Sequence, residues 1–508
     1  MSESGRGVDV LIVGSGPAGS TFVREIREAV PGATVVMVEA GPRLTTETGV
    51  NIRNLETRQR ETAQRTAEKA AGLHGRCSET GQVNGLVAAC PGMSLVGSPV
   101  VDGDGQAGMP AAAIACNVGG MGVHWTCACP KPGDSERIDF LGAEFDAAFD
   151  RACRLLNVTQ EAFPETEGGL RLRTALSAMF DDGRAPDRRV QPMPLAARPR
   201  GDGRPEWSGT ASLLDGLTGA EEGFTLRDET LCRRLLTHGE QVIGAELAHR
   251  PTGRVEIVKA QYVVVAGDAL RTPQLLWASG IRPAALGRYL NDQPQLHSAL
   301  IVHDKLLDEM PDGLHYEGAD LRDDLVGVLW VPFHDPDLPY HTQVMLVGTG
   351  PTGAQTGTGV HRQVVGYGRF LAKDIRAEDR VEFSNVPDRN GMPTMTIHYD
   401  LTPRDRSNID RALRLLTEEG RRLGSFLPGE TPRLLPAGSS MHYQGSVRMA
   451  AIDDGTSVCD PTSRVWGTDN LYVAGNGVIP SATACNPTAT AVALAVLAAR
   501  SIVERLRA

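Results

Sequence analysis

Three glycines near the N-terminus, Gly14, Gly16 and Gly19, have the GxGxxG spacing of a phosphate-binding turn. A β-branched run at 8–13 precedes them and a helical stretch follows. In such a unit Gly14 permits the tight turn, Gly16 lets the backbone approach a pyrophosphate, and Gly19 permits close packing of the helix on the strand. The first helical amides, at the positive end of the helix dipole, would face the phosphates.

A carboxylate at the end of the next strand completes this pattern. The apolar run 35–38 leads to Glu39, which follows Gly19 by 20 residues. A carboxylate in this place can accept hydrogen bonds from ribose hydroxyls and would repel a 2′-phosphate. The strand–turn–helix–strand unit therefore predicts that the protein binds a dinucleotide, either FAD or NAD.

The overall composition is that of a soluble globular protein large enough for two domains. The chain has 508 residues, of which 41% are hydrophobic and 22% charged. It has no apolar run of about 18 residues and no basic segment followed by an apolar core, so we expect no membrane span, no signal peptide and a cytoplasmic location. The net charge of −11 argues against a nucleic-acid partner. The charge either helps to attract a cationic substrate or serves solubility alone.

The cysteines give no sign of a metal site or a disulfide framework. There are nine, scattered singly apart from Cys127 and Cys129, and none has CxxC or Cys/His ligand spacing. Reduced thiols in the cytosol fit this pattern best. No basic residue adjoins Cys127 or Cys129 in the sequence, so we interpret both as small apolar packing residues.

The remaining pattern predicts two kinds of sheet. Strands are expected at 223–231, 241–249 and 254–266, and a last strand followed by a small-residue helix occupies 470–506. Between 296 and 400 apolar runs alternate with Gly, Pro and Asp turns, which suits an antiparallel sheet with one wet face, and a helix is expected near 403–424.

We therefore expect an α/β fold in which a Rossmann-like dinucleotide-binding domain is interrupted by a second domain with a largely antiparallel β-sheet. The dinucleotide-binding domain would comprise residues 1–135, 205–293 and 436–508. Residues 136–204 and 294–435 would form the substrate-binding domain.

Three segments together resemble the glucose-methanol-choline (GMC) oxidoreductases. They are VLIVGSGPAGS with Glu39, VVVAGDALRTPQLL with LGRYLNDQP at 286–294, and NLYVAGNGVIPSATACNPTATAVALA near the C-terminus. The resemblance covers nearly the whole chain in the right order. It implies the GMC fold, related to p-hydroxybenzoate hydroxylase, with FAD as the cofactor and oxidation of an alcohol as the activity.

A further segment, GGMGVHWTCACP at 119–130, resembles the flavin-attachment segment of the pyranose 2-oxidases. This resemblance implies that Gly119 and Gly120 lie at the flavin, that His124 is linked covalently to the flavin 8α-methyl group, and that Thr126 lies near flavin N5. The alternative for His124 is a packing histidine beside noncovalent FAD. Relatives of this subgroup include bacterial glycoside 3-oxidases and the alcohol dehydrogenases of aminoglycoside biosynthesis.

Two residues match the catalytic pair of the family. His442, in SSMHYQGSVRM, matches the catalytic histidine, and an imidazole suits the base because its ordinary pKa lies near 6.5. Asn486 would donate a hydrogen bond to the substrate oxygen as it gains alkoxide character. The alternatives are a hydrogen-bonded structural histidine and an ordinary helix N-cap, because Asn486 precedes Pro487 at a helix start.

The resemblance also implies the remaining contacts of the site. Further cofactor contacts are expected from Gly475, Asn476, Pro487 and Thr488. The helix that starts there would point its positive end at the flavin pyrimidine ring.

Tyr340 begins a segment that resembles the one before the substrate loop of pyranose 2-oxidases. This resemblance implies that His341, Thr342 and Gln343 line the substrate side, with a purely structural strand as the alternative.

The function predicted from this resemblance is FAD-dependent oxidation of a hydroxyl group on a sugar, glycoside or amino-sugar to the carbonyl, by hydride transfer to flavin N5. The flavin would be reoxidised by O2, giving H2O2, or by a quinone-like acceptor. A narrower alternative is oxidation of the 6′-hydroxyl of an aminoglycoside antibiotic precursor. Alternatives of other classes are a redox-neutral flavoprotein similar to hydroxynitrile lyases and a noncatalytic flavoprotein scaffold.

Overall fold

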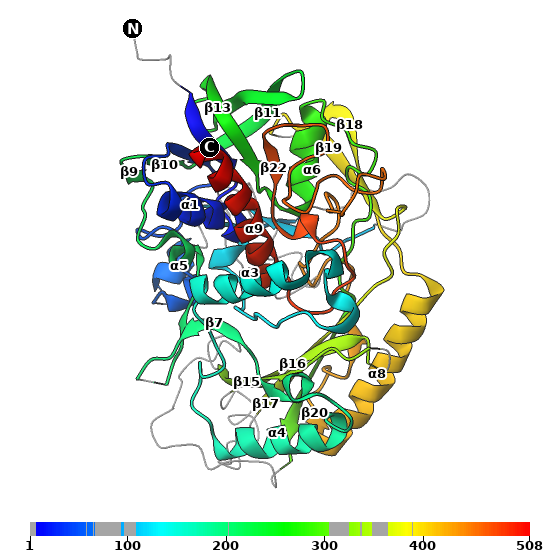
Figure 1. Cartoon of the computed structure of the whole chain (residues 1–508). Helices are drawn as coiled ribbons and strands as arrows, with labels where there is room; N and C mark the ends of the chain where they lie inside the picture. The colour runs from blue at the N-terminus through cyan, green and yellow to red at the C-terminus, as the bar shows by residue number, and fades with distance from the viewer. Residues whose placement is uncertain are drawn as a thin grey trace.

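The computed structural model describes residues 7–56, 58–63, 66, 93–95, 108–201, 203–303, 325–335, 338–347, 364–388 and 390–508. Two large sheets with helices packed on them make up most of this part of the chain (Figure 1). In the orientation of Figure 1 the first sheet lies in the upper half and the second in the lower half. Among the described residues no helix combines the length and the apolar character needed to cross a membrane.

The first sheet has a parallel centre in the order β22–β13–β1–β2–β10. Its strands are β1 (Val8–Val13), β2 (Val35–Val38), β10 (Phe224–Arg227), β13 (Val255–Val265) and β22 (Leu471–Val473). The β-branched run of β1 is buried on both faces: Val10 and Ile12 belong to one core cluster and Leu11 to the other. A strand covered on both sides needs such a continuous apolar run, which explains why the sequence shows no alternation here.

Helices α1 (Pro17–Ala29) and α9 (Thr488–Arg507) share one core cluster with the parallel strands. Helix α9 is rich in alanine, and its small side chains let it pack both on the sheet and against α3 (Gly142–Leu155) (Figure 1). Segments near the two ends of the sequence therefore pack against each other beside the first sheet.

Strands β11 (Thr230–His238) and β12 (Gln241–His249) extend β13 as an antiparallel ribbon. Helix α6 (Asp268–Ala278) follows β13, with Pro273 in its second turn. The edge strand β9 (Ala220–Glu221) pairs with β10 in the antiparallel sense.

The expectation of one antiparallel sheet over 296–400 is wrong for its last two strands. Strands β18 (Arg380–Pro387) and β19 (Pro393–His398) form a separate hairpin. The hairpin packs beside α6 of the first domain: the rings of Trp277 and Phe383 are 6.1 Å apart, and Gln274 donates a hydrogen bond of 2.6 Å to the carbonyl of Pro393. Alternation of apolar residues indicates a strand but does not specify which sheet it joins.

The second sheet has the order β20–β14–β17–β16–β15–β6, with β21 on the edge of β14, and all of its pairs are antiparallel. Its strands are β6 (Gln191–Pro192), β14 (Gln295–Val302), β15 (Leu325–Val331), β16 (Tyr340–Val347), β17 (Val364–Leu371), β20 (Gly424–Phe426) and β21 (Arg433–Leu434). One face packs against α4 (Glu167–Phe180) and α8 (Pro403–Leu423) in a single core cluster.

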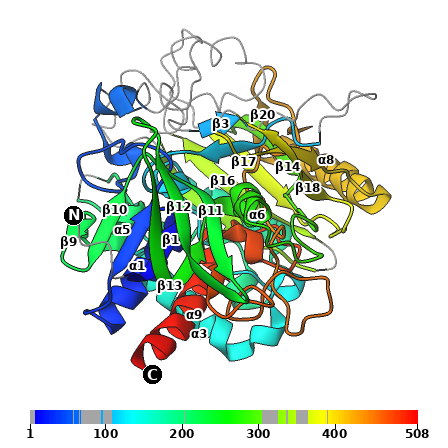
Figure 2. The same ribbon diagram turned by 90° about the horizontal axis from the view of Figure 1, so that it is seen from above.

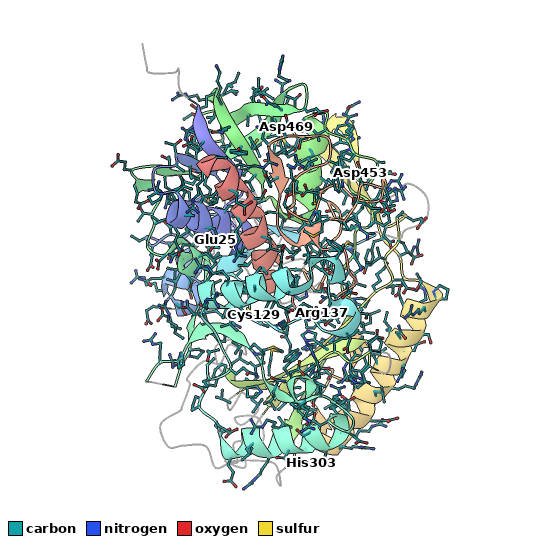
Figure 3. All side chains as sticks on the ribbon, in the orientation of Figure 1. Glu25, Cys129, Arg137, His303, Asp453 and Asp469 are labelled. Atoms are coloured by element: carbon teal, nitrogen blue, oxygen red, sulfur yellow. The ribbon has the colours of Figure 1, made fainter. Side chains whose placement is uncertain are left out.

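The other face of this sheet is only in part the wet surface that the sequence suggested, because the residues of β14 alternate between half-buried and buried. All eight residues of β17 are buried, and the residues that alternate with its core residues line an internal cavity. Figure 2, seen from above, shows β14, β16 and β17 beside α6 and the strands of the first sheet. Cys129, labelled in Figure 3 below α3, belongs to the core where the two halves meet.

Candidate active site

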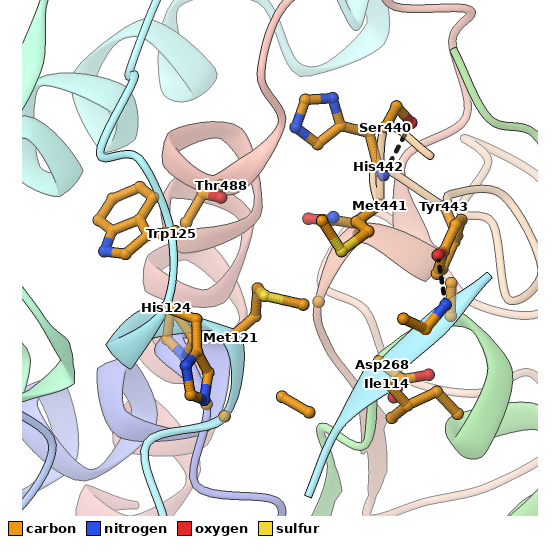
Figure 4. A pocket seen from close by; sticks show the side chains of 18 of the residues that line it. Ile114, Met121, His124, Trp125, Asp268, Ser440, Met441, His442, Tyr443 and Thr488 are labelled. Atoms are coloured by element: carbon orange, nitrogen blue, oxygen red, sulfur yellow. Dashed lines mark hydrogen bonds between the residues drawn. The ribbon is translucent and has the colours of Figure 1, made fainter. Parts of the chain in front are cut away.

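A cavity of about 1060 Å³ lies between the two domains. We call one side the nucleotide wall: the turn 14–18, Glu39 and the segment 119–126. We call the other side the sheet wall: the cavity-facing residues of β14, β16 and β17, which are Gln295, His297, Ala299, Gln343, Met345, Val347, Val364, Gly366, Gly368 and Phe370. Figure 4 shows His124, Trp125 and Met121 on one side of this pocket and Met441 and His442 on the other.

The glycine turn has the geometry of a phosphate cradle. Gly14 has φ +105°, and a Cβ there would lie 2.3 Å from the Ala266 carbonyl oxygen, while a Cβ at Gly19 would lie 2.0 Å from the carbonyl oxygen of Gly14. At Gly16 the nearest described atom to a Cβ is Gly120 Cα at 4.0 Å. Gly14 and Gly19 are therefore required by the protein's own packing, whereas Gly16 keeps space open toward the cavity.

Helix α1 starts directly after Gly16, and within the described chain no side chain caps it. Its first turn, including Pro17 and Ala18, lines the cavity. Uncapped amides at the positive end of a helix fit an anionic pyrophosphate.

Glu39 lines the cavity and ties the nucleotide wall together. Its carboxylate accepts hydrogen bonds from the amide (3.2 Å) and hydroxyl (2.8 Å) of Ser15 and from the amide of Gly41 (3.0 Å). The hydroxyl of Ser15 in turn accepts from the amide of Gly119 at 2.9 Å. Burial raises the pKa of the Glu39 carboxyl group, whereas the donors from Gly41 and Ser15 lower it. Glu39 thus joins the glycine turn to the segment that carries His124.

His124 is held as a neutral imidazole with one nitrogen unused. Its Nε2 lies 2.9 Å from Oδ1 of Asn117, whose amide nitrogen donates to the carbonyls of Val118 and Gly120. Because Oδ1 only accepts, Nε2 carries the proton and the lone pair is on Nδ1. That Nδ1 is buried and has no hydrogen-bond partner among the described residues. Burial lowers the pKa of His124 to about 3.

The rest of this segment is shaped by backbone conformations that favour glycine. Gly119 and Gly120 have φ of +89° and +53° and lead into a 3-10 turn that ends before His124. The indole nitrogen of Trp125 donates to the carbonyl of Ser208 at 2.8 Å, and Thr126 is exposed to the cavity.

His442 is oriented by a glutamine that the sequence reasoning missed. Its Nδ1 lies 2.7 Å from Oε1 of Gln293, while Nε2 of Gln293 donates to the carbonyl of Cys485 at 2.8 Å and to the hydroxyl of Thr483 at 3.2 Å. These bonds fix the orientation of the amide, so Nδ1 of His442 carries the proton and Nε2 keeps its lone pair. Burial lowers the pKa of His442 to about 3, so the ring is neutral near pH 7. Gln293 lies within the quoted LGRYLNDQP segment, but no spacing rule marked it as functional.

Asn486 completes a chain of side-chain amides. Its Nδ2 lies 3.3 Å from Nε2 of His442, and its Oδ1 accepts from Nε2 of Gln343 at 2.5 Å. Helix α9 has Pro487 as its N-cap residue, and within the described chain no side chain caps it. The alternative that Asn486 serves as a side-chain N-cap is therefore wrong, and its amide is available to the cavity.

A buried carboxylate, also missed, anchors the loop before Asn486. Glu136 is 1% exposed and accepts from the amides of Ala484 (2.8 Å) and Cys485 (2.9 Å) through one oxygen. The other oxygen accepts from the amide of Gly133 at 3.1 Å. Burial raises the pKa of this carboxyl group, whereas the hydrogen bonds from these backbone amides lower it. A single distant glutamate in a sequence gives no signal of such a role.

The loop that carries His442 is held in a constrained conformation. Met441 has φ +57°, and the amide of His442 donates to the hydroxyl of Ser440 at 3.1 Å. Asp292 accepts from that hydroxyl and from the amide of Gly438 (3.0 Å), and burial raises the pKa of Asp292 to about 6. A non-glycine residue in this backbone region costs about 1–3 kcal/mol, so the surrounding bonds must hold it.

The three residues expected at the substrate differ in where they point. Gln343 lines the cavity. His341 is fully buried: its Nδ1 accepts from the indole of Trp330 at 3.1 Å, and Phe370 lies between His341 and His442 with ring centroids at 5.3 and 5.2 Å. Burial lowers the pKa of His341 to about 3.

Thr342 requires a correction. Its hydroxyl accepts from Nε of Arg369 at 2.9 Å, on the face of the sheet that packs against α8. Successive residues of a strand point to opposite faces, so Thr342 cannot share the cavity side with Gln343. The expectation that Thr342 lines the substrate side is therefore wrong.

The C-terminal contacts are closer to expectation. Gly475, Asn476 and Thr488 line the cavity, and Gly475 has φ +98° with no described atom within 4 Å of a Cβ built there. Pro487 starts α9. Cys127 and Cys129 lie in the hydrophobic core, where burial raises the pKa of both thiols, in agreement with a packing role.

This arrangement places a neutral imidazole with an available lone pair beside an amide donor, across a cavity from an anion-binding glycine turn. A neutral imidazole of this kind can accept a proton, and the glycine turn can hold an anion, so the cavity has groups for a nucleotide and for a second molecule beside it.

Comparison with known proteins identifies the family. The GMC oxidoreductase family models match residues 202–295 and 376–495. The chain is 45% identical over 510 residues to a C-glycoside 3-oxidase of Microbacterium trichothecenolyticum (99% of this chain, 97% of the relative), and 47% identical over 505 residues to one of Arthrobacter globiformis (98% and 95%). It is 34% identical over 538 residues to a pyranose 2-oxidase of Tricholoma matsutake (98% and 94%). The chain belongs to the GMC oxidoreductase family.

A solved structure agrees with this assignment at the level of the fold. The formate oxidase of Aspergillus oryzae RIB40, studied for its FAD modification, superimposes with a TM-score of 0.67 over 100% of both chains at 18% identity. The predicted family, the α/β fold with an antiparallel second sheet, and the assignment as an oxidoreductase are confirmed.

Proposed function

We propose that this enzyme uses FAD to oxidise a ring hydroxyl of a glycoside to the ketone, with the C3 hydroxyl of a C-glycoside as the first candidate. The observation that carries the proposal is the His442–Asn486 pair, with the lone pair of Nε2 beside a donor amide in a cavity that also holds the glycine turn. The two relatives named C-glycoside 3-oxidase, at 45% and 47% identity over nearly the whole chain, support the choice of substrate.

The nucleotide wall fits FAD. Gly16 and Gly475 leave room where side chains would intrude, the uncapped α1 faces the cavity, and Glu39 lies where a ribose would be bound. Bound FAD supplies a two-electron acceptor for the hydrogen on the carbinol carbon.

The protein's own contribution is the handling of the hydroxyl proton. Nε2 of His442 accepts that proton, while Gln293 keeps Nδ1 protonated and the ring in place. The amide of Asn486 turns its Nδ2 donor from His442 to the substrate oxygen as negative charge develops there. Gln343 holds Oδ1 of Asn486, so the donor end of the amide stays directed at the cavity.

We further propose that His124 bonds through Nδ1 to the 8α-carbon of the flavin; one methyl C–H hydrogen would leave as a proton, and its electron pair would reduce the flavin, which O2 would reoxidise. The support is that Nδ1 carries the lone pair and is buried with no partner among the described residues, while Asn117 occupies Nε2. Acid precipitation tests this: the yellow colour should stay with the precipitate. Colour released to the supernatant would rule out the bond.

The proposed acceptor is O2, with formation of H2O2, because the full-length relatives are named oxidases. The test is aerobic incubation with a C-glycoside, a free monosaccharide and an aminoglycoside precursor, with peroxide and product measured together. A 3-keto-C-glycoside and an equal amount of peroxide are expected. If product forms only with an added quinone, the acceptor is a quinone and not O2. If only the aminoglycoside precursor is oxidised, the substrate is an aminoglycoside and not a C-glycoside.

A further inference from the structure

The cavity face of the second sheet carries a row of residues that runs from the catalytic amide to a charged cluster. Gln343, bonded to Asn486, pairs with Gly368; Gly368 pairs with His297, and His297 with Arg433. Neighbouring strands are separated by about 4.8 Å, so the backbones of Gln343 and His297 lie about 10 Å apart. That distance leaves room for a ring beside the sugar that is being oxidised.

The floor between these two residues is made of glycine. Gly368 lies between Gln343 and His297, and Gly366 lies between Met345 and Ala299 in the next row. A Cβ at Gly366 would approach Met345 Cε at 3.4 Å, and one at Gly368 would approach the Phe370 ring at 3.5 Å. Neither glycine has a positive φ, so the backbone would accept other residues. What the glycines provide is room for the side chains of Met345 and Phe370 to lie low over the sheet, which keeps the floor shallow.

A polar cluster closes the far end of this floor. The carboxylate of Glu430 lies 3.2 Å from Nε2 of His297 and 3.0 Å from the Arg433 guanidinium. All three side chains line the cavity and are partly exposed there. Because the carboxylate accepts from Nε2, the lone pair of His297 is on Nδ1, and the cluster offers both acceptors and guanidinium donors. A hydroxyl group, which both donates and accepts, matches that combination.

The sides of the floor are apolar. The cavity-lining residues next to it are Leu325, Met345, Val347, Leu427 and Leu435. Several hydroxyls of a second sugar in this place would face these apolar side chains without a hydrogen-bond partner. Each such hydroxyl would weaken binding. A flat aromatic ring gains contact with the same side chains and with the glycine floor, and a methionine sulfur is a favourable neighbour for it.

We propose that this surface, formed by Gly366, Gly368, His297, Glu430 and Arg433, is an aglycone subsite that binds a hydroxylated aromatic ring attached to the sugar. The proposal rests on the proposed function, because it places the sugar of the same substrate at His442. The polar cluster binds the ring hydroxyl, and the glycine floor and apolar sides contact the ring itself.

The test compares para-hydroxyphenyl, phenyl and methyl β-glucosides and maltose in the holoenzyme and in Glu430→Gln. The measured quantity is kcat/KM for each substrate relative to methyl glucoside. We expect the advantage of the para-hydroxyphenyl glucoside over methyl glucoside to fall about tenfold in Glu430→Gln, the effect of losing one hydrogen bond from a charged group. The smaller advantage of the phenyl glucoside should persist, because it arises from the floor.

The chain offers a matched control in the exposed hairpin β18–β19. There Glu382 pairs with His398 at 3.0 Å and Arg380 at 2.6 Å, the same three residue types. Glu382→Gln should leave the ratio unchanged. A second variant, Gly366→Leu, should lower the ratio for both aryl glucosides, and melting temperatures report whether each variant is folded.

Three results would overturn the subsite. The first is a ratio unaltered in Glu430→Gln, the second is an equal drop in Glu382→Gln, and the third is maltose depending on Glu430 as strongly as the phenol does. Anaerobic calorimetry of para-hydroxyphenyl glucoside separates this failure from that of the proposed function. If binding depends on Glu430 but no oxidation occurs, the subsite is supported and the proposed oxidation is contradicted. If oxidation occurs without any dependence on Glu430, the proposed oxidation is supported and the subsite is contradicted.

Discussion

The two walls of the cavity are built in different ways. The nucleotide wall draws its glycine turn and Glu39 from one contiguous stretch, 8–39, in which each residue acts close to its neighbours in sequence. The sheet wall takes residues from three separate strands, and the proposed catalytic pair, His442 and Asn486, comes from two further loops. The difference shows that the glycine turn and Glu39 are encoded locally, whereas the segment 119–126 of the nucleotide wall and the whole substrate side depend on contacts between distant segments.

The largest effect is expected on the substrate side, from His442→Ala. Loss of the base should lower kcat/KM by about 10²–10⁴-fold while flavin content stays at the parent level, because His442 does not hold the nucleotide wall. Steady-state kinetics with the flavin spectrum as a control measure this. Turnover within a few-fold of the parent would refute the assignment of the base.

Asn486→Ala should have the next largest effect, about 10²–10³-fold in kcat, because it removes the donor to the developing alkoxide. Helix α9 should remain stable, since Asn486 does not cap it. The comparison variant is Thr490→Ala, one turn further along the helix and buried. If Asn486→Ala lowers the melting temperature enough to explain the loss of rate, the role of Asn486 is structural.

Gln293→Glu should change the pH dependence rather than only the rate. A carboxylate beside Nδ1 favours the imidazolium, so the pKa of His442 should rise from about 3 by about 1–3 units. A base whose pKa is raised is lost as the pH falls through the new value, so an acid limb should enter the kcat/KM profile near pH 4–6. The parent should show no limb from His442 in that range. Identical profiles would mean that Gln293 does not control this ring.

On the nucleotide wall, substitutions at Gly14 and Gly16 should have different effects: the first on protein stability and the second on flavin binding. Gly14→Ala meets a carbonyl oxygen at 2.3 Å and has a positive φ, so it should lower the free energy of unfolding by more than about 1 kcal/mol. Gly16→Ala has open space, so apoprotein stability should change by less than about 0.5 kcal/mol while flavin content falls. Denaturant unfolding and flavin release measure the two quantities. If Gly14→Ala and Gly16→Ala destabilise the apoprotein equally, Gly16 is also required for packing and not only for flavin binding.

The smallest effect on turnover is expected from Thr342→Val. Its hydroxyl serves the fully buried Arg369, so stability should fall by about 1–3 kcal/mol while kcat/KM stays within about twofold. Gln343→Leu, its neighbour in sequence, should do the opposite, because it faces Asn486. A change in KM for Thr342→Val comparable to that for Gln343→Leu would contradict the assigned faces of β16.

These contrasts explain what the sequence could predict. The glycine turn, Glu39 and the strands β12 and β13 follow from local spacing and apolar runs, and the order of motifs indicated the family. Which of Thr342 and Gln343 faces the cavity depends on the register of β16, and a shift of one residue exchanges the two faces. The hairpin β18–β19 was assigned to the wrong sheet for a related reason, since alternation does not encode the partner strand.

Gln293 and Glu136 were beyond sequence reasoning because their roles arise from contacts with segments about 150 and 350 residues away. Gln293 acts by a hydrogen bond to His442, which the resemblance did identify, and Glu136 acts by hydrogen bonds to the amides of Ala484 and Cys485, directly before Asn486. Positioning residues of this kind are visible once the fold brings the segments together.

The most direct test of flavin-dependent glycoside oxidation is anaerobic mixing of the purified enzyme with a C-glycoside while the flavin absorbance is recorded. We expect a yellow protein whose flavin is bleached by one equivalent of glycoside per flavin, with His442→Ala bleaching at least about a hundredfold more slowly. A purified chain without flavin, or a flavin that stays oxidised with every glycoside tested, would contradict flavin-dependent glycoside oxidation.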